Sequence, residues 1–191
     1  MASQPTDFQI SAVAEMLAEA GFSSRQAMNR LRYLATQDAA MLNSYGKRAG
    51  SGKTSAYLYP LHEVCKVKVL FALMDSGIAD MLVLSCANAG LIAGFIPDGA
   101  SEAVRKRLLA LKGSPIQRAI EDIRKGGWPS FVLTYFRNSD NGAKYYRGTV
   151  LLTDEKPESG NPADPYIPRT SIVVDLRSLL LPLLRDRANE N

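Results

Sequence analysis

Apolar residues recur at every third or fourth position early in the chain, which is the spacing of amphipathic helices. This pattern predicts a first helix over 10–20, ended by Gly21, and a second helix over 25–37, capped by Ser23 or Ser24. Two helices joined by a tight turn that contains glycine are the outline of a helix-turn-helix unit.

A polar, glycine-rich segment, NSYGKRAGSGKTS, follows the second helix. Tyr57 and Tyr59 then alternate with other residues, as in a short strand, so that 43–59 is expected to form a hairpin. Pro60 is a favoured first residue for a third helix, which Gly77 would end. The predicted apolar stripe of that helix consists of Leu61, Val64, Val67, Phe71 and Met74.

Glycine and proline cluster near 90–100 and predict a boundary between two domains, 1–90 and 91–191. In the second domain, amphipathic helices precede strand-like runs, and an Asn-Gly turn follows the first of these runs. This order favours an α+β fold class with a short antiparallel sheet. The predicted elements are helices over 101–111, over 115–125 and from Leu176 onward, strands over 128–137, 144–153 and 170–175, and a proline-rich loop over 154–168.

Composition excludes several classes of protein. The chain has 191 residues, of which 46% are hydrophobic and 22% charged, as is ordinary for globular proteins and unlike disordered ones. One histidine and two cysteines are too few for a closed zinc site built from this chain alone. No apolar run reaches the length of a membrane span, and the N-terminus does not resemble a signal peptide. We therefore expect a cytoplasmic protein that binds neither a metal nor a membrane.

The predicted second helix has two unlike faces. Ala27, Leu31, Leu34 and Ala35 gather on one side at 100° per residue. The opposite side carries polar side chains of the types that make paired hydrogen bonds to base edges in a DNA major groove, although an ordinary solvated face is also polar. The candidate residues on and beside this face are Arg25, Gln26, Asn29, Arg30, Arg32 and Tyr33.

The hairpin adds further positive charge. Lys47, Arg48 and Lys53 accompany three glycines without an acidic residue, which suits a wing that approaches phosphates, or else a flexible surface loop. From Arg25 to Lys68 there are eight basic and two acidic residues, a net charge of +6, whereas the whole chain is only +4. This concentration of charge indicates a nucleic-acid partner.

The order of these parts resembles the MerR-like winged helix-turn-helix proteins, which include phage excisionases. The stretch YLYPLHEVCKVKVLFALMDSGI and the triplet Leu31-Arg32-Tyr33 are similar to that family's wing strand, third helix and recognition helix. The loop before Tyr57 is longer than in the family, and the likeness covers only 8–83. It implies DNA binding, usually by a dimer, and implies nothing about the second half. The matching positions in the stretch are Tyr57, Tyr59, Glu63, Leu70, Leu73, Gly77 and Ile78.

Motifs for catalysis are incomplete. AGSGKT lacks the first glycine of a phosphate-binding loop, because Lys47 occupies that position, and Ile172-Val173-Val174-Asp175 is only a commonplace strand ending in an acid. His62 and Cys65 lie one helical turn apart, but two ligands do not make a metal site. We therefore expect neither catalytic residues nor a cofactor, and a protein that is not an enzyme.

Two features of the second half allow more than one interpretation. Its aromatic residues can line a ligand pocket, stack on nucleic acid, or form cross-strand pairs inside the fold. Its leucine-rich last helix can pack on its own domain or on a second copy of the chain. The aromatic set, with one arginine, is Trp128, Tyr135, Tyr145, Tyr146 and Arg147, and the leucine set is Leu176, Leu179, Leu180, Leu183 and Leu184.

Together these patterns predict a bacterial or phage winged helix-turn-helix protein that binds specific double-stranded DNA as a homodimer and regulates transcription. The recognition helix is 25–37 and the basic wing is 43–59, with Tyr57 among the DNA contacts. The C-terminal α+β domain would serve dimerisation, an effector or a protein partner. Two alternatives remain open: an excisionase-like factor that bends DNA, and an adaptor whose helix-turn-helix fold binds protein.

Overall fold

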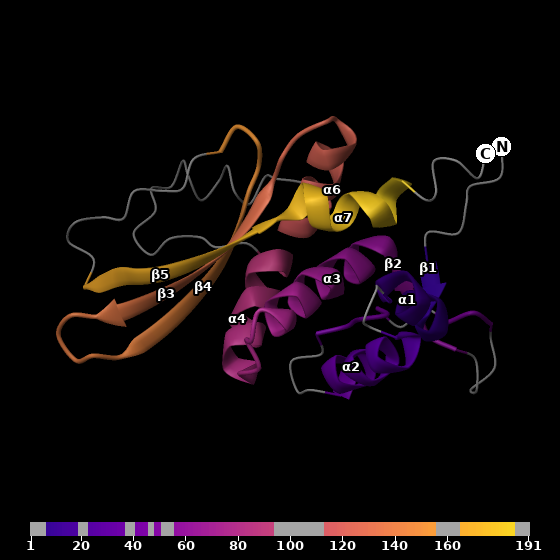
Figure 1. Cartoon of the computed structure of the whole chain (residues 1–191), viewed down its shortest axis with the longest axis horizontal. Helices are drawn as coiled ribbons and strands as arrows, with labels where there is room; N and C mark the ends of the chain where they lie inside the picture. The colour runs from indigo at the N-terminus through magenta and orange to yellow at the C-terminus, as the bar shows by residue number, and fades with distance from the viewer. Residues whose placement is uncertain are drawn as a thin grey trace. The chain divides into compact units, whose positions relative to one another are not determined.

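The fold was obtained as a computed structural model, which describes residues 7–18, 23–36, 41–45, 48–50, 56–93, 113–155 and 165–185. Within these ranges it contains six helices and two small antiparallel sheets, so the α+β class is confirmed (Figure 1). The chain divides into two compact units, Met1–Phe71 and Ala72–Asn191.

The first unit combines a two-stranded sheet with a pair of packed helices. Strand β1 was not predicted, because three residues show no periodicity; it pairs antiparallel with β2 so that Phe8 lies opposite Tyr59. Helix α1 packs against α2. The elements are β1 (Asp7–Gln9), α1 (Ile10–Leu17), α2 (Ser24–Thr36), β2 (Leu58–Pro60) and α3 (Leu61–Asp75), the last of which continues into the second unit.

Helices α1 and α2 confirm the predicted faces and most of the predicted bounds. Leu17 is buried at the end of α1, three residues before the expected end, and Gly21 lies outside the described residues. Ser23 is the cap of α2: its hydroxyl accepts from the backbone N–H of Gln26 at 3.3 Å. The inward face of α2 is the expected one, with Ala27, Leu31 and Leu34 fully buried.

Helix α3 differs from the amphipathic helix that the sequence predicts. It begins at Leu61, because Pro60 ends strand β2, and every residue from 63 to 71 is buried. Gly77 ends it as expected, with φ of 90° and its N–H donating to the Met74 carbonyl at 3.0 Å. The helix therefore has no solvent-facing stripe over most of its length.

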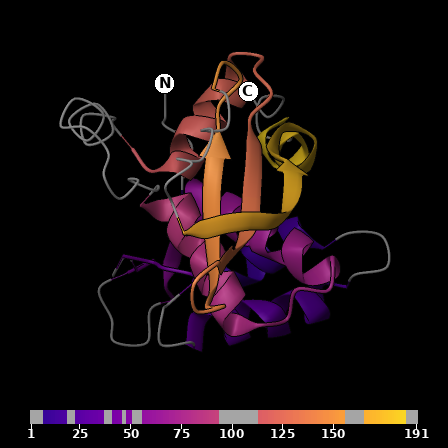
Figure 2. The same cartoon turned by 90° about the vertical axis from the view of Figure 1, so that its left-hand side faces the viewer.

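The second unit is built on a three-stranded antiparallel sheet in the order β4-β3-β5 (Figure 2). The expected turn after the first strand is present, and Gly142 there has φ of 71°. Helix α4 packs on β4, α6 contacts α4, α7 and β4, and α7 contacts β3 and β5. The elements are α4 (Met81–Ile92), α6 (Pro115–Arg124), β3 (Ser130–Asn138), β4 (Lys144–Leu151), β5 (Tyr166–Asp175) and α7 (Leu176–Arg185).

A contact between two glycines places α4 in the second unit. A Cβ atom at Gly90 would overlap the backbone carbonyl of Gly148, and a Cβ atom at Gly148 would lie 2.9 Å from the Phe131 ring. The division between the units thus precedes α4, whereas the expected boundary follows it, near 90–100. Residues 94–112 lie outside the described ranges, including the predicted helix over 101–111. The assignment of separate roles to 1–90 and 91–191 stays a prediction.

Two further differences concern the end of the chain. Strand β5 begins at Tyr166, inside the predicted loop, because Pro168 sits on an edge strand beside a register shift, where a missing N–H is tolerated. Leu176, Leu180 and Leu183 of α7 are buried in the single chain, so these leucines pack within their own fold. Within the described ranges no helix combines the length and apolar character needed to cross a bilayer.

Candidate nucleic-acid interface

The outward face of α2 carries four of the predicted contact residues. Arg25, Asn29 and Arg32 are exposed, and the Tyr33 side chain is 44% exposed. No acidic residue occurs in α2. The surface of this helix is therefore positively charged and rich in hydrogen-bond donors, as the sequence predicts for this face.

Two other predicted contact residues have contacts inside the unit. The Gln26 Oε1 atom accepts from the Ser23 N–H at 2.8 Å and from the Ser23 hydroxyl at 3.1 Å, which completes a capping box. Arg30 is half-buried, and its guanidinium lies 5.4 Å from the centre of the Phe71 ring. Both residues thus stabilise α2, a role that their polar character did not reveal.

A shallow groove of about 450 Å³ lies between α1 and α2. Arg25 and Arg32 reach it from α2, and Glu15 reaches it from α1. The groove gives three predicted contact residues a common concave surface. Its lining residues are Ser11, Ala14, Glu15, Ser24, Arg25, Met28, Asn29 and Arg32.

The base of the predicted wing is a hairpin. Arg48 and Tyr57 form an antiparallel bridge, and the Ala49 N–H donates to the Ala56 carbonyl at 2.9 Å. The Arg48 guanidinium lies 4.4 Å from the centre of the Tyr57 ring and donates to its hydroxyl at 2.7 Å. These two predicted residues are together and exposed. Lys47 and Lys53 lie outside the described residues.

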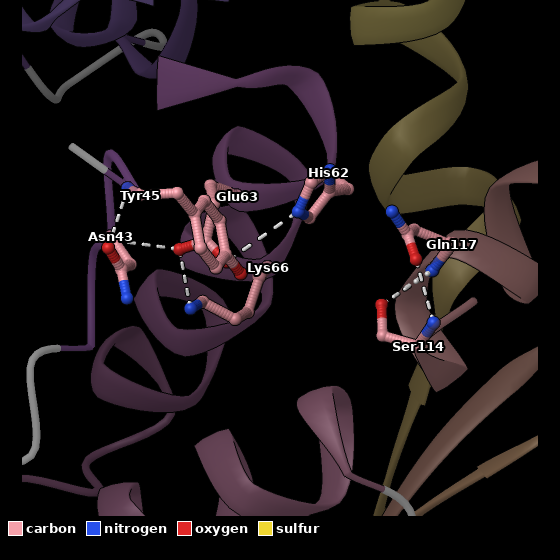
Figure 3. A network of polar contacts seen from close by, with 7 residues as sticks. All are labelled: Asn43, Tyr45, His62, Glu63, Lys66, Ser114 and Gln117. Carbon is pink, nitrogen blue, oxygen red and sulfur yellow. Dashed lines mark hydrogen bonds and ion pairs between the residues drawn. The ribbon is translucent and has the colours of Figure 1, made fainter. Parts of the chain in front are cut away.

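A buried carboxylate connects the start of the wing to α3 (Figure 3). Glu63 is 1% exposed, and its Oε2 atom accepts from Lys66 Nζ at 2.6 Å and from the Asn43 N–H at 2.9 Å. Its Oε1 atom accepts from the Tyr45 hydroxyl at 2.9 Å and lies 3.9 Å from His62 Nε2. One side chain therefore fixes three positions of the fold.

Tyr45 is held in an unusual conformation at this network. Its φ is 52°, and its N–H donates to Asn43 Oδ1 at 2.7 Å, as in an Asx turn. Its ring lies 5.9 Å from that of His62. Desolvation of the hydroxyl and the adjacent Glu63 carboxylate raise the pKa of Tyr45 to about 12. Burial lowers the pKa of the Lys66 ammonium, which Glu63 partly opposes.

Two of the eight basic residues counted over 25–68 are buried. Lys66 is fully buried against Glu63, and Lys68 is only 7% exposed. Neither ammonium is placed to contact a phosphate from solvent. Both lysines belong to the net charge of +6 over 25–68 that indicated a nucleic-acid partner. Glu63 and Lys66 are three residues apart in a largely apolar helix, a pattern that is typical of a buried ion pair.

The aromatic residues singled out in the second half, all of which the structure describes, do not converge on one pocket. Tyr135 and Tyr146 form a cross-strand pair with ring centres 5.3 Å apart, and Phe136 and Tyr145 form another at 5.8 Å. Because neighbouring residues of a strand alternate, the two pairs occupy opposite faces of the sheet. Trp128 lies beneath the Arg177 guanidinium, 4.4 Å from it, before β3 begins.

The acidic end of strand β5 caps a helix. Asp175 accepts from the N–H of Arg177 at 2.9 Å and of Ser178 at 3.1 Å. The hydrogen bond from the Ser178 hydroxyl, at 2.6 Å, is the main cause that lowers the pKa of the Asp175 carboxyl. This residue therefore has a structural role in starting α7.

Comparisons with known proteins add no assignment. No family model matches the chain, and no curated protein or solved structure matches it either.

Proposed function

We propose that the first unit is a MerR-like winged helix-turn-helix that binds double-stranded DNA in a sequence-specific manner and regulates transcription. The observation that carries the proposal is the joint exposure of Arg25, Asn29 and Arg32 on one concave surface. Across the described residues, neither of these two guanidiniums has an ion-pair partner within 4.0 Å, so their charge is available to an anion.

The proposed geometry divides the contacts between two elements. Helix α2 enters a major groove, where Arg25 and Asn29 meet base edges and Arg32 meets a phosphate. The wing, through Arg48 and its neighbouring lysines, follows the adjacent backbone. The hairpin base at Arg48 and Tyr57 supports this role, because it holds an arginine at the surface of the same unit as α2.

Glu63 supports the wing in this proposal without touching DNA. Its bonds to Asn43 and Tyr45 fix the first residues of the wing. The second unit would join two copies of the chain or receive an effector. Several adjacent sites with bent DNA, in place of one isolated site, would favour the excisionase-like alternative.

The test is a selection for preferred duplex sequences with the full chain, followed by affinity measurements on the selected site and on random DNA. Asn29→Ala is expected to lose about ten-fold or more on the selected site and little on random DNA, since it removes a base contact. Arg48→Ala is expected to weaken both sites by a similar factor. Equal losses on both DNAs from both variants would refute this division of roles.

A further inference from the structure

The sheet of the second unit has a far end, at the β3–β4 turn, that carries exposed aromatic residues. Helix α4 meets the sheet at Gly148, in the half of β4 remote from this turn. Nearer the turn, Tyr145 of β4 is 41% exposed and Tyr166 of β5 is 37% exposed. Tyrosine rings are large and apolar and usually pack against other residues, so two partly exposed rings at one end of a sheet are available for contact with a ligand.

Three rings on this end form a continuous row. The ring centres of Phe136 and Tyr145 are 5.8 Å apart, and those of Tyr145 and Tyr166 are also 5.8 Å apart. The Arg147 guanidinium lies 4.8 Å from the centre of the Phe136 ring. Strand alternation places Arg147 on the same face as Tyr145, two residues away. The row therefore combines planar rings with a cation on one face of the sheet.

The end of the sheet that carries this row is rich in positive charge. In the sequence of the far end, 134–147 and 166–171, four residues are basic and one is acidic. The acid, Asp140, lies in the turn, where its carboxylate accepts from the Ser139 hydroxyl at 3.0 Å. The four basic residues are Arg137, Lys144, Arg147 and Arg169, and all except Arg147 are exposed. Alternation places Arg137 and Lys144 on the opposite face, at the same end of the sheet, and Arg147 on the face of the row.

We propose that this face, Phe136, Tyr145, Arg147 and Tyr166, binds single-stranded nucleic acid. The exposed rings of Tyr145 and Tyr166 accept the flat faces of unpaired bases, while Phe136, which is 8% exposed, supports Tyr145 from within the sheet. Arg147 on the same face, with the basic residues at this end of the sheet, neutralises the phosphates. A duplex hides its base faces within its own stack, so it offers the rings nothing to stack on. The site is separate from the duplex contacts proposed for α2, and its existence does not depend on them.

The experiment measures fluorescence anisotropy of a labelled oligothymidylate of about a dozen nucleotides with the full chain at low salt. A chain carrying Arg25→Ala and Arg32→Ala serves as the background, because it lacks the α2 cations. In that background, Tyr145→Ile with Tyr166→Ile is expected to weaken single-strand binding roughly ten-fold or more per ring. Isoleucine keeps the strand propensity of both positions, so the sheet is retained. Tyr145→Phe keeps the ring and is expected to bind as the background does.

The matched control is Trp128→Ile, which removes an exposed ring stacked with Arg177 elsewhere in the same unit. It is expected to leave single-strand affinity within about two-fold, and circular dichroism checks that each variant is folded. The proposal is overturned if the background chain does not bind the oligothymidylate, or if the double isoleucine variant binds as tightly as the background. It is also overturned if the Trp128 variant loses as much affinity as the double variant. If the background chain loses duplex binding but still binds the oligothymidylate, the result concerns the proposed duplex contacts of α2 and does not contradict the single-strand site.

Discussion

The two units are stabilised by different kinds of close contact. In the first unit, a buried carboxylate, Glu63, gathers a lysine, a backbone N–H and a tyrosine hydroxyl. In the second unit, the backbones of Gly90 and Gly148 touch because neither carries a side chain. The Glu63 contact depends on charge, so its partners can be replaced without loss of stability only when the paired charges are removed together. The Gly90–Gly148 contact depends on the absence of side chains and does not tolerate an added methyl group. Single substitutions at the two places should therefore behave differently.

The largest expected effect is the removal of the Glu63 carboxylate. Glu63→Ala leaves the Lys66 ammonium buried without its partner and removes the acceptor of the Asn43 N–H. Breaking a buried ion pair in this way is expected to lower the free energy of unfolding by about 3–5 kcal/mol. Urea denaturation followed by circular dichroism measures the change.

The control for this variant removes both charges together. Glu63→Leu with Lys66→Met fills similar volume without leaving a charge unpaired, and it should recover most of the lost stability. If the double variant is as unstable as Glu63→Ala, the loss comes from the contacts to Asn43 and Tyr45 and not from the ion pair.

The next largest change in stability is expected from Gly90→Ala, which adds a methyl group between α4 and β4. Helix propensity alone would make Gly90→Ala stabilising by roughly 1 kcal/mol. We expect the opposite sign, a loss of about 2–3 kcal/mol, because the new Cβ overlaps the Gly148 carbonyl. Ala89→Gly, at the exposed neighbouring position, measures the propensity term separately in the same denaturation experiment. A stabilised Gly90→Ala protein would mean that the helix and strand are farther apart than described.

A smaller effect is expected at the start of α7. Asp175→Ala removes the helix cap and should cost about 1 kcal/mol at neutral pH. The lowered pKa of Asp175 means that its contribution is complete above the carboxyl's ordinary pKa and is lost as the pH falls through the folded-state value. The difference in stability between wild type and variant should therefore shrink in acid. Asp154→Ala, which removes another exposed acid of the same unit, is the matched control in the same experiment.

The smallest effect concerns Tyr45 in alkali. Its pKa of about 12 exceeds the ordinary tyrosine value of 10.0, so the folded state holds this proton more tightly than the unfolded state. Its contribution is complete below pH 10.0 and is lost as the pH rises through about 12. The stability of wild type should fall toward that of Tyr45→Phe over this range, as measured by urea midpoints at increasing pH. A constant difference would show that the hydroxyl does not donate to Glu63.

Helical periodicity, helix-start signals and strand composition predicted those parts of the fold that depend on residues close together in the sequence. Periodicity identified the inward face of α2, because Ala27, Leu31 and Leu34 lie within two helical turns of one another. The helix predicted over 115–125 is present as α6, and Ser114 and Gln117 form a capping box at its start, with the Ser114 N–H donating to Gln117 Oε1 at 2.7 Å (Figure 3). Most of each predicted strand in the second unit is also present.

The features that the sequence did not predict depend on residues far apart in the chain. Strand β1 exists because β2, some fifty positions later, pairs with it. The place of α4 depends on a glycine in β4, and the pairing of Glu63 with Asn43 depends on how the intervening hairpin folds back. For the candidate interface, the exposed residues of α2 were predicted from their face alone, whereas the structural contacts of Gln26 and Arg30 required three-dimensional partners.

The most direct test of duplex binding by the first unit is its salt dependence. Fluorescence anisotropy with random duplex DNA, from low to physiological salt, should show log affinity falling linearly with log salt concentration. Arg25→Ala with Arg32→Ala should weaken binding and flatten that slope by roughly one unit, since Arg32 is the proposed phosphate contact and each lost phosphate contact reduces the slope by about one. Arg124→Ala with Lys125→Ala removes the same charge from the exposed end of α6 and should leave both quantities unchanged. Absence of binding at low salt, or equal losses from the two double variants, would contradict the assignment of α2 as the DNA-contacting helix.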